Sequence, residues 1–468
     1  MAARKGQHGK RRRAKPQPQA AALALLPKAL RDVTLHGNCQ WTPIVLALAG
    51  LCWAWSNQPS LSQRWEQTRD LLARWMPGAF LPTTDHSFLK TLAGSTKRLT
   101  AALVALMRQR ALAAAPDGTL DGRQVYAVDG TKVGVPWTSD HDRKLGQGSL
   151  KSRKKRGGKP RRKRRAKRRS ANSKAHDAVR PQILLTLFWH LASGLPWAWR
   201  MDPVGGSERA AALAMLAALP AGALILGDAG FTGFDFWHGV LGSGRHFVLR
   251  IGANVTLLKN LGWRCRTKNG VAYLWPAKQQ QRGAAPVIVR LVRVRTGRGE
   301  MWLATSLLRP QQASDRQLAD LYRQRWGIEG WFRSLKQTFG KRTMLSRTAK
   351  HAECELQWSI LALGLVQAHG VEALAAAGAE AQALSESAAL AAFRTTVLQR
   401  DFARPDLPRL RVRLAAARLD DYCRTKPKAG RHAHRQRTYQ PTGSPQLRSA
   451  TPAERHRARE VQAALGLA

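Results

Sequence analysis

Residues 322–336 read Tyr322-Arg-Gln-Arg-Trp-Gly-Ile-Glu-Gly-Trp-Phe-Arg-Ser-Leu-Lys336. Apolar residues recur in this stretch at helical spacing, which predicts one amphipathic helix with Trp326 and Trp331 in its core. Four polar residues follow one another at intervals of three, four and seven positions and would share one face of that helix: Tyr322, Arg325, Glu329 and Lys336. A carboxylate among such donors suits a site that binds a metal ion through the acid and a polyanion through the donors. The alternative is a solvated face with ordinary ion pairs.

Two apolar stretches upstream each run into an aspartate. Residues 125–133 predict a buried strand that ends at Asp129, where Gly130 begins a turn. Residues 223–231 predict a second strand that ends at Asp228 and leads into a helix. Either aspartate alone is more typical of a turn. A nucleotide-binding fold shares this order of elements, but the chain contains neither GxGxxG nor GxxxxGK[ST].

The three acids are far apart in the sequence. Asp228 follows Asp129 by 99 positions, and Glu329 follows Asp228 by 101. Acids so widely separated come together only if a central sheet and the helices packed on it bring them to one place. We therefore predict an α/β fold with a ribonuclease H-like mixed sheet flanked by helices. Three carboxylates are the oxygen ligands that a pair of Mg²⁺ ions requires for phosphoryl transfer, a reaction that needs no protein nucleophile.

The chain is strongly basic, because 78 Lys and Arg residues against 29 Asp and Glu residues give a formal net charge of +49. This imbalance indicates a polyanionic partner, with nucleic acid favoured over a membrane surface. In residues 151–169, 14 of 19 residues are Lys or Arg, and this block is predicted to bind phosphates without reading sequence. No apolar run is long enough to span a bilayer. The five cysteines form no CxxC pair, which argues against a zinc site and indicates a cytosolic protein.

Two basic stretches have both a DNA-binding and a structural interpretation, and Glu208 has only a structural one. Residues 87–112 predict a helix that packs in a bundle and whose basic residues are candidates for a DNA-facing side: Lys90, Lys97, Arg98, Arg108 and Arg110. The strand predicted at residues 287–295 alternates apolar and basic residues, as a DNA-facing or an ordinary half-exposed strand would. Glu208 follows Ser207, a predicted N-cap, and is interpreted as a first-turn acid favoured by the helix dipole, not as a ligand.

The pattern Tyr322-x2-Arg325-x3-Glu329-x6-Lys336 resembles the helix that carries the last acid of the IS4-type DDE transposases, a family of bacterial insertion-sequence enzymes. The resemblance covers the chain from about residue 40 to about residue 370. It implies that Tyr322, Arg325 and Lys336 contact the phosphates of the transposon ends. The basic block at residues 151–169 departs from the family pattern.

The same resemblance extends to the acids and to one tryptophan. Asp129 in VDGTK, Asp228 in GDAGF and Glu329 in RWGIEGW match the catalytic, metal-binding DDE triad of the family. The resemblance implies two Mg²⁺ ions, with Mn²⁺ as a substitute. Trp302 takes the place of a tryptophan that stacks on a flipped base beside the cut, and its alternative role is that of a core aromatic at a strand start.

The sequence then predicts a division of the chain into successive parts. The expected parts are a disordered basic tail (1–19), a helical N-terminal DNA-binding region (20–120), a ribonuclease H-like catalytic domain (121–345) interrupted by a basic loop (143–174) and a β-rich insertion (246–308), a helical C-terminal region (346–425) and a basic tail (426–468).

Together these features predict a transposase that cuts DNA at inverted repeats and transfers the strands to target DNA. The expected partners are the transposon ends, target DNA and a second copy of the chain in a synaptic homodimer, with no membrane. The expected location is the bacterial cytoplasm, in association with the nucleoid. Two alternatives stay open: a metal-dependent nuclease of the same fold that only hydrolyses, and a non-catalytic DNA-binding protein derived from a transposase.

Overall fold

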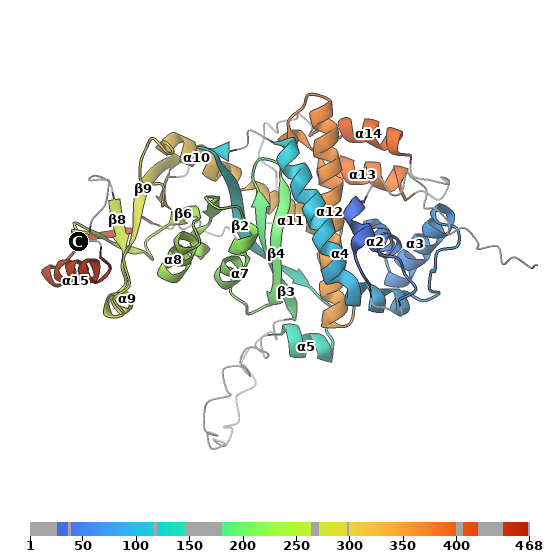
Figure 1. Ribbon diagram of the computed structural model, residues 1–468, viewed down its shortest axis with the longest axis horizontal. Coiled ribbons are helices and arrows are strands. Elements are labelled where there is room, and N and C mark those ends of the chain that lie inside the picture. The colour runs from blue at the N-terminus through green and yellow to red at the C-terminus, as the bar shows by residue number, and fades with distance from the viewer. Residues whose placement is uncertain are drawn as a thin grey trace, which may run out of the picture.

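One mixed sheet of 11 strands organises the protein, and its strands follow the order β11-β7-β8-β9-β10-β6-β5-β2-β3-β4, with β1 paired to β2 outside this path (Figure 1). The computed structural model describes residues 26–35, 39–115, 119–146, 180–263, 271–296, 299–398, 406–419 and 443–466. The strands are β1 (Thr119–Leu120), β2 (Arg123–Gly134), β3 (Gln182–His190), β4 (Leu195–Pro203), β5 (Leu224–Gly227), β6 (His246–Ile251), β7 (Thr256–Lys259), β8 (Val271–Leu274), β9 (Val287–Thr296), β10 (Gly299–Thr305) and β11 (Gln446–Ser449). The predicted N-terminal tail and nearly all of the basic loop lie outside the described residues.

Five neighbouring strands form one end of this sheet, in the order β4-β3-β2-β5-β6, with β4 at its edge. Strand β3 is antiparallel to both β2 and β4, whereas β5 is parallel to β2 and β6 is parallel to β5. Three antiparallel strands extended by two parallel ones, with the first of the five along the chain in the middle, is the arrangement of a ribonuclease H-like sheet. The predicted fold class is therefore confirmed.

Helices cover both faces of these strands. The helices of the described residues are η1 (Lys28–Asp32), α2 (Pro43–Trp55), α3 (Leu61–Trp75), α4 (Asp85–Ala114), α5 (Ser139–Leu145), α7 (Glu208–Met215), η2 (Leu216–Ala218), η3 (Ala229–Phe231), α8 (Phe234–Gly242), α9 (Ala277–Gln281), α10 (Asp315–Gln324), α11 (Gly327–Arg333), the π-helical η4 (Ser334–Thr338), α12 (Ala349–Ala376), η5 (Ala381–Ala383), α13 (Glu386–Thr396), α14 (Leu407–Ala415) and α15 (Pro452–Ala464). Neighbouring residues of a strand point to opposite faces. Gly130 of β2 faces α7, and Thr131 accepts a hydrogen bond from Lys336 of η4, so α7 and η4 lie on opposite faces.

The helical N-terminal part packs on α12, which lies beside α4 in Figure 1. Its core is rich in aromatic rings, and Trp65 stacks on Phe88 with 4.3 Å between the ring centroids. A buried ion pair between Arg64 and Glu355, with 3.2 Å between nitrogen and oxygen, joins α3 to α12. Helix α12 is long and apolar enough to cross a membrane, but 72% of its most apolar window is buried inside the protein. It is the helix around which this part of the molecule packs.

The β-rich insertion continues the central sheet, which corrects its predicted start. Strand β6 lies within the range predicted for the insertion, yet it pairs with β5 as a core strand. Strands β7 to β10 extend the sheet from there, because β10 pairs antiparallel with β6 and β9 pairs with β10. The insertion therefore begins after Ile251, and its hairpin is held rigidly to the catalytic part of the sheet.

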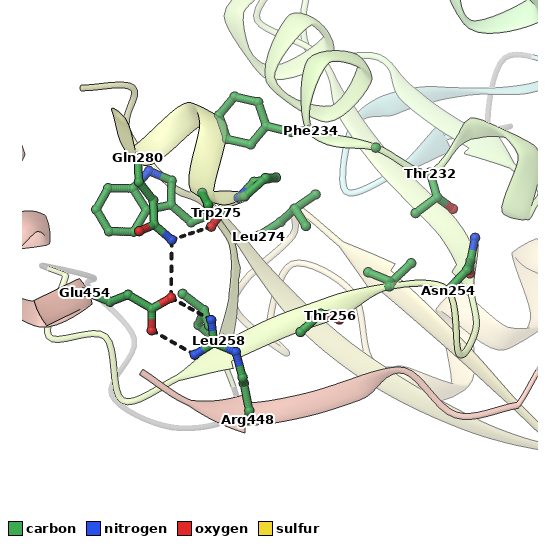
Figure 2. Close-up of a pocket in the computed structure, with 14 residues that line it drawn as sticks. Thr232, Phe234, Asn254, Thr256, Leu258, Leu274, Trp275, Gln280, Arg448 and Glu454 are labelled. Atoms are coloured by element: carbon green, nitrogen blue, oxygen red, sulfur yellow. Dashed lines mark hydrogen bonds and ion pairs between the residues drawn. The ribbon is translucent and has the colours of Figure 1, made fainter. Parts of the chain in front are cut away.

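Residues 443–466 form a strand and a helix, which corrects the prediction of a basic tail over residues 426–468 for the residues that the structure describes. Strand β11 pairs in parallel with β7, and α15 buries Ala458 and Val461 against the insertion. Figure 2 shows the adjacent pocket, about 350 Å³ in volume, where Glu454 of α15 accepts hydrogen bonds from Arg448 and Gln280. The basic composition concealed this short apolar face. Residues 426–442 lie outside the described part of the chain.

Two other predicted elements differ from the structure. Strand β2 does not end at Asp129 but continues to Gly134, because its ladder with β3 runs on from Asp129 opposite Leu187 to Gly134 opposite Gln182. The single helix predicted over residues 322–336 is interrupted between α10 and α11, where the hydrogen bonds from Trp326 N–H to Arg323 and from Ile328 N–H to Arg325 span three residues. Trp326 is therefore turned outward and 59% exposed, contrary to prediction, whereas Trp331 is buried as predicted.

Candidate functional site

The pairing of β2 with β5 brings the two aspartates of the sequence prediction side by side. Val125 lies opposite Leu224 and Ala127 opposite Leu226, so each residue of β2 faces the residue 99 positions further along the chain. Asp129 and Asp228 are separated by this same interval, and they follow the last paired residues on adjacent strands. Adjacent strands lie about 4.8 Å apart. The two carboxylates therefore belong to neighbouring positions at one edge of the paired region.

Each aspartate is also held by its own backbone. Asp129 accepts a hydrogen bond from the N–H of Gly130 at 2.8 Å, and Asp228 caps η3 by accepting one from the N–H of Gly230 at 2.8 Å. Burial raises the pKa of Asp129 to about 6, and the charges of Asp228 and Glu329 add to this increase. The Gly130 N–H and the guanidinium of Arg325 offset only part of the effect. Burial is therefore the main reason that ionisation of Asp129 is disfavoured in the metal-free protein.

Arg325 links Glu329 to Asp129. One guanidinium nitrogen lies 3.2 Å from Oε1 of Glu329, and the other lies 3.7 Å from Oδ2 of Asp129. The Arg325 side chain is only 5% exposed and lies against the rings of Tyr322 and Trp326, with 5.5 and 5.4 Å from its central carbon to the ring centroids. The four-residue spacing from Arg325 to Glu329 survives the helix interruption, because the backbone stays right-handed through both residues of the break.

Tyr322 lies beneath this guanidinium and not at the surface. Helix α10, which carries it, begins at a capping box formed by Ser314 and Gln317. The face of α10 that carries Tyr322 packs against the protein interior. Tyr322 is therefore 3% exposed, and burial raises its pKa to about 12. The structure therefore places Tyr322 as a support for Arg325.

Lys336 reaches the same face of β2 as Asp129. Its ammonium donates a hydrogen bond to the hydroxyl of Thr131 at 2.6 Å, and residues 129 and 131 point to the same side of the strand. Burial, together with the charge of Arg342, lowers the pKa of Lys336. Thr131 lies two residues, or about 6.6 Å along the strand, beyond Asp129.

Trp302 lies on β10, two strands away from β5. It is paired with Ile251, and Leu249 is paired with Gly227, so Trp302 is level with the edge at which Asp228 lies. Its ring is partly buried, and its indole N–H donates a hydrogen bond to the hydroxyl of Ser444 at 3.1 Å. The structure therefore places Trp302 level with Asp228 and two strands away from it.

Sequence reasoning missed Glu208 as a neighbour of this site. It is half-buried at the start of α7, and a Cβ added to Gly130 would lie 2.1 Å from its Oε1. Burial raises the pKa of Glu208, as does the charge of Asp228, and Lys132 offsets part of the increase. The available signal was topological: β4 runs in the same direction as β2, so the helix that follows β4 starts at the edge where Asp129 lies.

The basic residues proposed to face DNA partly form hydrogen bonds within the protein, although Arg98 stays exposed. Arg108 donates to the carbonyl of Trp197, Arg98 to that of Thr34, and Arg110 contacts His369. In the strand β9, Arg290 is buried and donates to the carbonyl of Ala313 at 2.6 Å. Lys90 and Lys97 remain exposed. These exposed lysines are the part of the α4 prediction that still leaves a DNA-facing side open.

The chemistry of the three acids fits a divalent cation, because half-buried carboxylates offer the oxygen ligands that such ions prefer. Their present arrangement does not surround a cation. Across the described ranges, no three His, Cys, Asp or Glu side chains converge on a point that could hold a metal ion. The guanidinium of Arg325 instead bridges Asp129 and Glu329. Metal binding by all three acids therefore requires this guanidinium to move.

Comparison with known proteins gives a family match and likenesses to solved structures. Residues 120–365, more than half of the chain, match a family model described as “Transposase DDE domain”, and this range includes all three acids. A cryo-EM structure of the piggyBac transposase synaptic complex with hairpin DNA is 10% identical, with a TM-score of 0.37, and the match covers 90% of this chain and 88% of that one. No matching curated protein was found.

Proposed function

Because the chain belongs to the family of transposase DDE domains, we propose that it moves an insertion sequence by cleaving DNA at inverted repeats and joining the freed strands to target DNA. The observation that best supports this proposal is the register of β2 and β5, which offsets the two strands by the same 99 positions that separate Asp129 from Asp228. Glu329 completes the set, tied to Asp129 through Arg325. These three residues are the proposed DDE triad.

DDE transposases use divalent metal ions, and we propose Mg²⁺ here, with Mn²⁺ as a substitute. Asp129, Asp228 and Glu329 would hold two such ions. When bound, these ions activate the attacking water or 3′-hydroxyl and stabilise the leaving oxygen. The protein's own contribution is to hold the carboxylates at the edge of a rigid sheet and to keep Arg325 close enough to orient Asp129 and Glu329 before the metal enters.

The cations beside the acids suit contacts with the transposon-end backbone. We propose that Lys336 and Arg325 bind phosphates, since both lie on the face of the sheet that carries Asp129. Tyr322 would reach the DNA backbone only as Arg325 moves, because it lies beneath that side chain. Trp302 is the proposed stacking partner for an unpaired base beside the cut.

Each part of the chain is proposed to have the role that the sequence led us to expect. Residues 20–120 would bind DNA, residues 121–345 would carry the chemistry, and residues 346–425 would contribute to a homodimer that holds two transposon ends together. Work on DNA in the bacterial cytoplasm suits the high net charge of +49. The two alternatives, a hydrolysis-only nuclease and a non-catalytic DNA-binding protein, differ from this proposal in products that can be measured.

The test is an assay of cleavage and joining on labelled DNA that carries the element's own ends, with Mg²⁺ present. The wild-type protein is compared with Glu329→Gln and with Glu460→Gln, a control on the exposed face of α15. We expect the wild type and the control to nick and join DNA, and Glu329→Gln to bind DNA equally well without cutting it.

Each alternative predicts a different product. Cleavage without joining by the wild type supports the hydrolysis-only nuclease and contradicts strand transfer. Binding without cleavage by all three proteins supports the non-catalytic DNA-binding protein.

A further inference from the structure

Helix α11, which carries Glu329, is interrupted at both ends. Before it, the N–H groups of Trp326 and Ile328 donate to carbonyls only three residues back. After it, η4 is π-helical, and the N–H of Phe339 donates to the carbonyl of Ser334 at 2.8 Å. Neither flank continues α11 as a regular helix. The direction in which α11 presents Glu329 therefore depends on the side chains that tie it to other helices.

A chain of three hydrogen bonds supplies such ties from α12 and α13. The indole N–H of Trp331, two residues after Glu329, donates to Oε1 of Gln367 on α12 at 2.8 Å. The amide nitrogen of Gln367 donates to Oε1 of Glu386, the first residue of α13, at 2.5 Å. The hydroxyl of Ser334, where η4 begins, donates to Oε2 of the same carboxylate. Glu386 is thus connected to both ends of the turn that follows Glu329.

Every hydrogen bond in this chain points towards Glu386. An indole N–H can only donate, which fixes the Gln367 amide with its oxygen towards Trp331 and its nitrogen towards Glu386. An ionised carboxylate can only accept, and its two oxygens serve Gln367 and Ser334 together. Trp331 and Gln367 are 1% and 2% exposed, and hydrogen bonds in such a buried chain strengthen one another.

Glu386 occupies this place at an electrostatic cost. It is half-buried, and burial raises its pKa to about 7, although the hydrogen bond from Gln367 offsets part of the increase. A first-turn acid can favour the dipole of its helix without leaving solvent. The Glu386 carboxylate turns instead towards α12 and η4. Its placement therefore serves α11 more than α13.

The contact between Arg325 and Glu329 cannot by itself fix α11 throughout the reaction. Metal binding by all three acids requires the Arg325 guanidinium to move, because it bridges Asp129 and Glu329. The hydrogen bonds of Trp331 and Ser334 do not involve this guanidinium. They are therefore suited to hold α11 while the acids take up the metal.

We propose that Glu386 is a positioning residue for Glu329. Through Gln367 and Ser334 it holds the end of α11 against the C-terminal helices, so that the carboxylate of Glu329 keeps its place when Arg325 moves. The inference rests on the proposed function, because that function gives Glu329 its catalytic role. In this role Glu386 touches neither the metal nor the DNA.

The test exchanges the carboxylate and the amide between α12 and α13. Glu386→Ala removes two hydrogen bonds, and Gln367→Glu places two carboxylates against each other. In the exchange variant Gln367→Glu/Glu386→Gln, every donor again finds an acceptor. The new carboxylate on α12 accepts from Trp331 and from the new amide on α13, and the oxygen of that amide accepts from Ser334. A helix-dipole role would not be restored, because the exchange removes the negative charge from α13.

The readout is the single-turnover rate at which the full-length protein cleaves labelled transposon-end DNA, at saturating DNA with Mg²⁺ at pH 8. Thermal melting in EDTA reports the stability of each variant. Misplacement of a catalytic group by about 1 Å lowers a rate by about 100-fold. We expect a loss of this size in Glu386→Ala and Gln367→Glu and recovery of most of the rate in the exchange variant. The matched control Ser385→Ala removes the N-cap of α13 and should lower the melting temperature without changing the rate.

The outcomes separate this inference from the proposed function. A folded Glu386→Ala that cleaves at the wild-type rate overturns the inference alone, as does an exchange variant that is no faster than Gln367→Glu. If Glu386→Ala does not fold, Ser334→Ala decides, because it removes a single hydroxyl: a slower rate supports the inference and an unchanged rate overturns it. A wild-type protein that cleaves no DNA overturns both the inference and the function on which it rests.

Discussion

Replacement of Asp129 by asparagine should stabilise the metal-free protein at neutral and alkaline pH. Folding raises the pKa of this carboxyl from 3.8 to about 6, mainly because the group is buried. A raised pKa means that the stability contributed by the protonated form is complete below pH 3.8 and is lost as the pH rises through about 6. A pKa unit corresponds to about 1.36 kcal/mol, so ionisation of Asp129 costs the folded state about 3 kcal/mol at pH 8.

Asparagine should avoid this cost, because it can still accept the hydrogen bond from the N–H of Gly130 while carrying no charge. The assay is urea denaturation in EDTA at pH 8 and at pH 4. Relative to the wild type, Asp129→Asn should gain about 3 kcal/mol in free energy of unfolding at pH 8 and much less at pH 4.

Asp140→Asn is the control of opposite sign. The N–H of Ala349 and the ammonium of Lys144 hold the pKa of Asp140 well below its usual range, so that its loss should destabilise the protein at pH 8. If Asp129→Asn is no more stable than the wild type at pH 8, or if its advantage is the same at both pH values, the electrostatic description of the site is refuted.

Three other predictions concern Gly327, Trp302 and the ion pair that α15 forms with β11. Gly327→Ala should lower cleavage by about 100-fold while leaving nonspecific DNA binding unchanged, because the new Cβ would lie 2.3 Å from the ring of Trp189 and must displace the helix of Glu329; equal cleavage rates would contradict this. Trp302→Ala should weaken stacking on an unpaired base by about 1–3 kcal/mol, measured with a fluorescent base analogue at the transposon end, and Trp302→Phe should retain most of it. Arg448→Ala removes the cation that lowers the pKa of Glu454 to about 2. Relative to the wild type, amide hydrogen exchange in α15 should accelerate most at neutral pH and less as the pH falls towards 2. The same acceleration at every pH would contradict the role of this pair.

The strands of the core could be predicted from sequence because their apolar runs are long and bounded by clear breaks. Strand β5 ends at Gly227, directly before Asp228, as expected. The same local signals failed at Asp129. Gly130 is a turn-former by composition, but the ladder with β3 keeps it in the strand, and its missing side chain leaves space for Glu208.

The spacing of polar residues within 322–336 predicted their contacts reliably, but it did not predict the break in the helix. The interval from Arg325 to Glu329 gave a real contact, yet the break between α10 and α11 turned Trp326 outward. Gly327 explains part of the difference, because its backbone lies against Trp189 on β3, a contact that no local pattern reveals. Glu208 was missed for the same reason: its local role at the start of a helix is sufficient by itself, and only the sheet brings it to the acids.

The most direct test of the whole account is a crystal structure of the protein with a transposon end and Mn²⁺, with data collected at the manganese absorption edge. The account predicts an anomalous peak that the carboxylates of Asp129 and Asp228 share, each about 2.0–2.3 Å from the ion, with the guanidinium of Arg325 moved away from Asp129. A peak bound by only one of the two aspartates, or the absence of a peak at this edge of the sheet, would contradict it.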